Sequence, residues 1–115
     1  MANLVFEIKR GDLAPIFRAQ CIDGSTGNAV DLTSATSIKL LIKDDTNTLI
    51  VNSLMTKEDQ TQAATKGFVR YAWTTGDTDQ SGVFRGEVEV TWSDGKPQTF
   101  PRDSYVRVII YDDLG

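Results

Sequence analysis

The sequence predicts an all-β fold, an immunoglobulin-like antiparallel β-sandwich of about seven or eight strands. Short runs alternate between apolar and polar residues, turn-forming residues separate them, and no window of fifteen residues shows a convincing helical period. The clearest run extends from Phe84 to Trp92, and the hairpin-forming pair Asp94-Gly95 follows it. Strands at this spacing are typical of a sandwich. A small β-barrel is the alternative, because periodicity alone does not separate the two.

The first half of the chain contributes three clear strands. Leu4 to Arg10 is predicted as a strand with alternate apolar residues on one face, and Gly11-Asp12 ends it. Ile16 to Ile22 is the second, with Pro15 at its edge, where a missing N–H is tolerated. Turn residues follow, and Ala29 to Leu32 is predicted as a short strand. Ser37 to Asp44 is the third clear strand.

The second half holds the remaining strands. Leu49 to Met55 is a weaker strand, and Phe68 to Trp73 places its aromatic residues on one face. Between them, Thr56 to Lys66 is the stretch with a helical alternative, but it lacks an apolar stripe, which favours a loop or a single helical turn. The run from Phe84 to Trp92 and a second alternating run from Tyr105 to Tyr111 complete the fold.

Composition restricts the function. The chain has 115 residues, 40% of them hydrophobic, which predicts one domain over residues 1–115. The net charge is −4 and the lysines and arginines are scattered, which disfavours nucleic acid as a partner. No apolar run is long enough for a membrane span, and the start, Met1-Ala2-Asn3, lacks the pattern of a secretory signal. Cys21 is the only cysteine, so no internal disulfide is expected. Histidine is absent, which removes the commonest general base and the commonest zinc ligand, and we expect no enzyme and no cofactor.

Several motifs have both a functional and a structural interpretation. Arg10-Gly11-Asp12 matches an integrin-binding tripeptide, but a strand end and turn explain it better. Acidic residues in loops can bind Ca²⁺, but turn formation explains them and the EF-hand pattern is missing. These residues are Asp44-Asp45, Asp77, Asp79 and Asp112-Asp113. We therefore expect no metal site.

The remaining candidates lie on strands. Glu87 and Glu89 could form a glycosidase pair, but cross-strand pairing with Arg107, beside Arg85, is the favoured role. An aromatic platform for a sugar is the second candidate, although strand alternation places its members in the core. Its members are Tyr71, Trp73, Phe84 and Trp92, with Trp92 the most exposed. Cys21 lacks a histidine partner and is interpreted as a small buried hydrophobic residue. No catalytic residue is predicted.

A family resemblance emerges from the order and spacing of four segments. They are Phe6-x-Ile8-x-Arg10-Gly11-Asp12, Asp31-Leu32-Thr33-x-Ala35-Thr36-x-Ile38, Gly67-x-Val69-x-Tyr71-x-Trp73, and Gly82-x-Phe84-x-x-Glu87-Val88-Glu89-Val90 with Asp94-Gly95-Lys96, Thr99-Phe100-Pro101 and Tyr105. With these segments the chain resembles the immunoglobulin-like N-terminal domain of phage baseplate upper proteins. The resemblance covers nearly the whole chain and implies no catalytic residues.

The resemblance implies a phage virion structural protein, an assembly or adaptor subunit of the tail, baseplate, neck or fibre attachment region. The module usually heads a longer chain, whereas this sequence ends at Gly115, so an adaptor or small subunit is expected rather than a receptor-binding head. The expected partners are other virion proteins and copies of itself, bound through the edge strands Leu4 to Arg10 and Tyr105 to Tyr111. A capsid decoration protein and a carbohydrate-binding module that binds a host-surface glycan are the alternatives. The expected location is the virion, after synthesis in the host cytoplasm.

Overall fold

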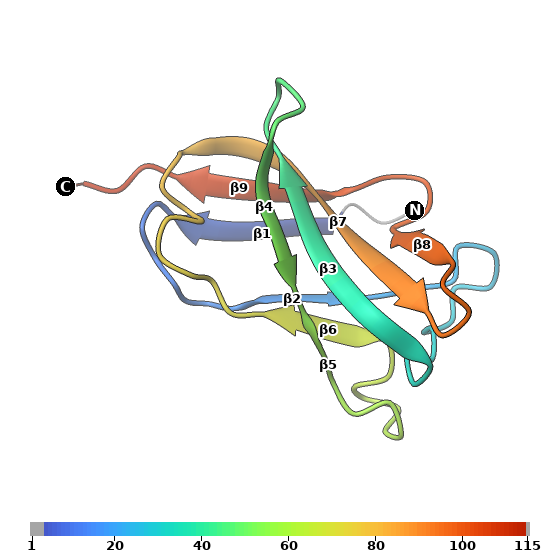
Figure 1. Ribbon diagram of the computed structural model, residues 1–115. Helices are drawn as coiled ribbons and strands as arrows, with labels where there is room; N and C mark the ends of the chain where they lie inside the picture. Colours follow the sequence, from blue (N-terminus) through green and yellow to red (C-terminus); the bar gives the residue numbers. More distant parts are fainter. Residues whose placement is uncertain (1–3, 115) are drawn as a thin grey trace.

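The computed structural model describes residues 4–114 and shows two β-sheets packed face to face (Figure 1). The described residues form nine strands and no helix. They are β1 (Leu4–Lys9), β2 (Phe17–Gln20), β3 (Ala35–Lys43), β4 (Leu49–Leu54), β5 (Thr56–Lys57), β6 (Phe68–Tyr71), β7 (Gly82–Trp92), β8 (Pro97–Phe100) and β9 (Val106–Tyr111). The predicted fold class, an all-β sandwich, is confirmed. No helix in this part of the chain could serve as a membrane span.

The larger sheet has six strands in the order β1-β9-β7-β3-β4, with β8 also paired to β7, and the smaller sheet has the order β2-β6-β5. Every pair is antiparallel except β1 with β9, which run parallel. Two details of the prediction are therefore wrong. The strands number nine, because the short β5 and β8 carry too few residues to show alternation, and the larger sheet is mixed.

The Asp94-Gly95 turn joins β7 to β8, where Thr91 lies opposite Pro97. Gly95 adopts a φ of +85°, a conformation that glycine adopts without strain. The run from Tyr105 to Tyr111 forms β9 and pairs with the other half of β7, from Gly82 to Gly86. Because β9 lies between β1 and β7, the expectation that the last strand is an edge is wrong.

The core lies between the two sheets and consists of inward-facing residues of alternating strands. One cluster centres on Phe17, Leu40, Ile42 and Val108, and the other on Leu32, Val69 and Val90, all of them at most 1% exposed. Leu32 belongs to the segment predicted as a short strand, which instead forms a single bridge between Ile22 and Ala29. That segment crosses from the smaller to the larger sheet, and Leu32 fills the space beneath it.

The two sides of the sandwich differ. On one side the chain passes directly from β4 to β5, so that Met55 connects the edge of one sheet with the edge of the other (Figure 1). The Met55 N–H donates to the Ile38 carbonyl at 2.8 Å, which holds this crossing against β3. On the other side β1 and β2 are the edge strands, and between them the sandwich is open.

Candidate functional site: the cleft between the β1 and β2 edges

The backbone of β1 is open on one side. Among the described residues, β1 pairs with β9 alone. The Arg10 N–H donates to the Tyr111 carbonyl at 2.7 Å, and the backbone groups of successive strand residues point to opposite sides. Phe6 and Ile8 therefore direct their N–H and C=O groups toward β9, and Val5 and Glu7 direct theirs outward. Unpaired groups of this kind are a template for another strand.

An apolar cleft of about 240 Å³ lies between this edge and β2. Its lining combines side chains from both sheets: Leu4, Val5, Phe6, Phe17, Arg18, Ala19, Gln20, Phe68 and Val106. Phe6 is half-buried at the base, with its ring centroid 5.3 Å from that of Phe17 and 5.6 Å from that of Trp73. Leu4 remains 40% exposed at the mouth, and beside it the side chain of Val5, 48% exposed, alternates to the outer face of the larger sheet. The cleft thus combines an aromatic floor with exposed aliphatic side chains, a lining typical of binding sites for apolar groups.

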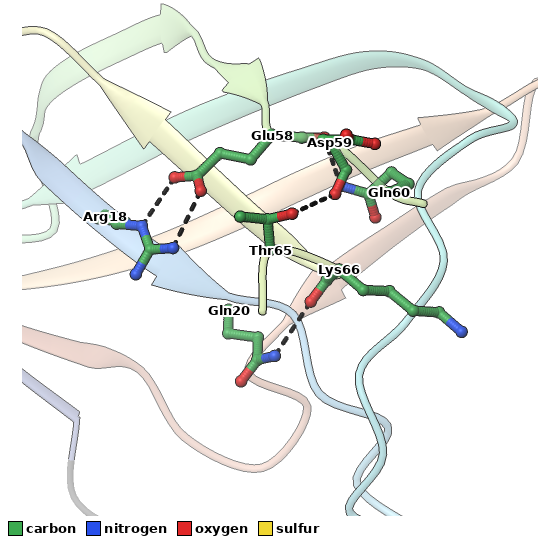
Figure 2. Close-up of polar contacts among 7 residues, drawn as sticks. All are labelled: Arg18, Gln20, Glu58, Asp59, Gln60, Thr65 and Lys66. Carbon is green, nitrogen blue, oxygen red and sulfur yellow. Dashed lines mark hydrogen bonds and ion pairs between the residues drawn. The ribbon is translucent and has the colours of Figure 1, made fainter. Parts of the chain in front are cut away.

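A charged pair holds one rim of the cleft. Figure 2 shows Arg18 of β2 facing Glu58, with Nε 2.7 Å and Nη2 2.9 Å from the two carboxylate oxygens. The guanidinium also lies over the Phe68 ring, 3.7 Å from its centroid. The hydrogen bond from Arg18 lowers the pKa of the Glu58 carboxyl and raises the pKa of Arg18 itself. The bidentate ion pair and the stacking on Phe68 together fix the orientation of the guanidinium plane at the rim.

The loop behind this rim is fixed by side-chain-to-backbone hydrogen bonds (Figure 2). Gln20 donates to the Lys66 carbonyl at 3.0 Å, and Thr65 donates to the Asp59 carbonyl at 2.5 Å. Gln60 makes two such bonds through one atom, because its Oε1 accepts the N–H groups of Leu32 at 3.0 Å and of Gly67 at 2.9 Å. One amide side chain therefore connects the loop to the crossing segment that carries Leu32.

Lys57 anchors the same segment. Its ammonium group lies 3.0 Å from the carbonyl oxygens of Leu32 and Thr33 and 3.3 Å from that of Ala35. Thr56 to Lys66 is thus a short strand and a structured loop, in agreement with the loop predicted there. The sequence showed that this stretch lacks an apolar stripe, but it did not indicate which groups the polar residues of the stretch bind.

The tripeptide Arg10-Gly11-Asp12 lies at the end of β1. Arg10 forms an ion pair with Asp113 at 2.9 Å, and Gly11 has a φ of +82°. The Gly11 N–H points at Thr78, whose hydroxyl donates to the Asp12 carbonyl at 3.0 Å. The structural interpretation, a strand end followed by a turn, agrees with these contacts.

The acidic loop residues serve the backbone. Asp44 accepts the N–H groups of Thr46 and Thr48, each at 2.9 Å, and hydrogen bonding within that turn lowers the pKa of its carboxyl. Asp77 accepts the Tyr71 hydroxyl at 2.6 Å and the Thr74 N–H at 2.9 Å. Over residues 4–114, no group of three or more acidic, cysteine or histidine side chains is placed to hold a metal ion.

Glu87 and Glu89 lie half-buried on the outer face of the larger sheet, as their alternation predicted. The predicted pairing with Arg107 is wrong, because Arg107 lies opposite Arg85 and none of the three ion pairs of the described chain involves it. Register explains the difference: Gly86 lies opposite Val106, so Glu87 and Glu89 lie beyond the start of β9. Their partners on β3 are Leu41 and Lys39, and Glu89 also lies opposite Thr99 of β8.

The aromatic candidates are core residues first. Tyr71, Trp73 and Phe84 are each at most 5% exposed, and Trp92 is half-buried, with its indole N–H donating to Gln98 at 3.0 Å. Cys21 is buried, and desolvation raises the pKa of its thiol to about 12. The core position of Tyr71, Trp73 and Phe84 and the burial of Cys21, both predicted from alternation, are confirmed. None of them contributes to the cleft except Trp73, through its contact with Phe6.

No family model matches the chain, and no curated protein matches it either. A solved structure with a similar fold is that of CopC from Methylosinus trichosporium OB3b, at 11% sequence identity and a TM-score of 0.49, covering 100% of this chain and 89% of CopC. The predicted resemblance to phage baseplate upper proteins is tested by none of these comparisons and stays a prediction. The predicted function, a phage virion structural protein, is corrected: the similar structure named here is CopC, and the comparisons supply no support for a phage component.

Proposed function

We propose that this protein is a non-catalytic binding domain that captures an extended segment of another protein chain at the β1 edge. The observation that carries the proposal is the open side of the sandwich. There the outward N–H and C=O groups of Val5 and Glu7 lie beside the mouth of the apolar cleft. An added strand would complete the backbone pairing of β1 and direct alternate side chains toward the cleft.

The residues that line the cleft indicate which side chains the bound segment should carry. The floor of the cleft is aromatic and aliphatic, so an apolar side chain of the bound strand fits there, with Phe6 and Phe17 beneath it. Arg18 is 44% exposed at the rim and uses Nε and Nη2 to bind Glu58, which leaves Nη1 available as a donor. A backbone carbonyl of the bound strand is a matching acceptor.

The test uses peptides selected for binding from a random library of extended sequences, followed by NMR of the labelled protein. We expect peptides with alternating apolar residues, and shifts of the Val5 and Glu7 amides and of the cleft residues. Val5→Pro removes an outward N–H that the fold does not use, and should abolish binding. Val5→Thr is the matched control, since it keeps the N–H and the β-branched shape, and should bind as the wild type does. Peptides whose shifts map elsewhere, or equal binding by both variants, would contradict the proposal.

A further inference from the structure

We propose that the partner strand at this edge is β1 of a second copy, paired antiparallel about a twofold axis at Phe6. The inference rests on the proposed function and names its partner. It joins the two larger sheets of the two copies into one continuous sheet. It also brings two of the apolar clefts together at the axis.

The hydrogen-bonding pattern of β1 limits how two copies can pair. In an antiparallel pair, a residue whose backbone groups point at the partner lies opposite a residue of the same kind. The outward-facing residues of β1 are Val5, Glu7 and Lys9. A twofold axis within the strand therefore lies at a residue and nowhere between adjacent residues. An axis at Val5 pairs only Leu4 to Phe6 of the described strand and an axis at Lys9 pairs Lys9 alone, which leaves Phe6, Glu7 and Ile8 to compare.

Charge and chain path select the axis at Phe6. An axis at Glu7 places the two Glu7 carboxylates directly opposite each other, which is unfavourable. An axis at Ile8 places Val5 opposite Gly11, where the chain has left the strand and the N–H is already committed to Thr78. An axis at Phe6 overlaps the copies from Leu4 to Ile8 and avoids the turn after Lys9, whose carbonyl accepts the Asp12 N–H.

The side chains on the inner face of β1 match in this register. Phe6 lies opposite Phe6 of the second copy, and Leu4 lies opposite Ile8. All of these are apolar, and Leu4, 40% exposed in one copy, gains an apolar neighbour. Cross-strand pairs of aromatic and aliphatic residues are the contacts that stabilise antiparallel sheets.

The outer face supplies a complementary charge. Val5, Arg107, Arg85 and Lys43 form one row across β1, β9, β7 and β3. Three cations in register repel one another, and within residues 4–114 none of them forms an ion pair. The axis at Phe6 places Glu7 of the second copy opposite Val5, at the end of this row and one strand away from Arg107. Within its own copy the Glu7 carboxylate accepts the Tyr111 hydroxyl, so it brings a negative charge that no cation among the described residues of its own copy neutralises through an ion pair.

Cysteine cross-linking tests the register. Val5→Cys and Glu7→Cys are prepared separately, and Cys21 stays silent in both because it is buried. We expect oxidation of the mixture to give roughly tenfold more cross-linked dimer than oxidation of either variant alone, because only facing cysteines fall within disulfide reach. Cross-linking of Glu7→Cys alone would place the axis at Glu7 instead. Equal yields in all three samples would indicate random collision and overturn the proposal.

Light scattering after size-exclusion chromatography tests the dimer itself. Wild type and Val5→Thr should elute as dimers, and Val5→Pro as a folded monomer with an unchanged circular dichroism spectrum. A wild-type chain that stays monomeric at about 1 mM overturns the inference. This outcome is distinguishable from a failure of the proposed function. If a monomeric wild-type protein still binds selected peptides at Val5 and Glu7, only the second copy is ruled out as the partner.

Discussion

Gln60 is predicted to be one of the most important polar residues for stability. Its Oε1 accepts two backbone N–H groups, from Leu32 at 3.0 Å and Gly67 at 2.9 Å, and its Nε2 donates to the Glu58 carbonyl at 2.7 Å. Gln60→Leu keeps the size of the side chain but leaves both N–H groups without their acceptor. Each unsatisfied, partly buried donor costs about 1–2 kcal/mol, so the free energy of unfolding should fall by about 2–4 kcal/mol. For a chain of this length that corresponds to a drop in Tm of roughly 8–15 °C.

Urea unfolding followed by tryptophan fluorescence measures this loss. Gln60→Glu is the matched control, because a carboxylate oxygen can accept both N–H groups while the donor to Glu58 is lost. We expect Gln60→Glu to lose about half as much stability as Gln60→Leu at neutral pH. A loss of less than about 1 kcal/mol in the free energy of unfolding for Gln60→Leu would show that the two N–H groups do not depend on this side chain for an acceptor.

Three further predictions concern other contacts. Lys57→Met removes the ammonium group that binds three carbonyl oxygens. Urea unfolding should show a free energy of unfolding lower by about 1–3 kcal/mol. An unchanged value would show that water replaces the ammonium group without cost. The Cys21 thiol, whose pKa burial raises to about 12, should react with a thiol reagent at pH 8 only after unfolding, and rapid reaction of the native protein would show that it is accessible. Because Arg18 lowers the pKa of Glu58 below its ordinary value of 4.5, their pairing contributes stability above that pH and loses it as the pH falls through the lower folded value. Urea unfolding between pH 3 and 7 should therefore show a shallower acid loss for Glu58→Gln than for wild type, and equal slopes would refute the contribution.

Strand alternation predicted much of the fold because one face of each long strand is buried. β3 and β7 show this best, since their residues alternate between buried and accessible almost without exception. The neighbours of each strand could not be predicted, because a period of two says nothing about pairing. The parallel pairing of β1 with β9 joins opposite ends of the chain, and this pairing leaves β1, rather than the last strand, at the edge.

The candidate site was predicted in part. The segment from Leu4 to Arg10 was expected to make contacts, and the structure places β1 at an open edge, although its binding role stays a proposal. The rim was not predicted, because Arg18 and Glu58 are forty residues apart in sequence and no local pattern connects them. The same holds for the cleft, because its lining comes from edge strands of two different sheets, β1 and β2, whose relative placement no local pattern encodes.

Amide hydrogen exchange along β1, measured by NMR in dilute solution and again at high concentration, shows directly whether this strand is an open edge. We expect slow exchange at Phe6 and Ile8, whose N–H groups face β9, and fast exchange at Val5 and Glu7 in the dilute sample. Val5 and Glu7 should become protected when a partner strand is added or the protein is concentrated. Protection of Val5 and Glu7 in the dilute monomer would mean that the edge is already covered, and would rule out β1 as a binding edge.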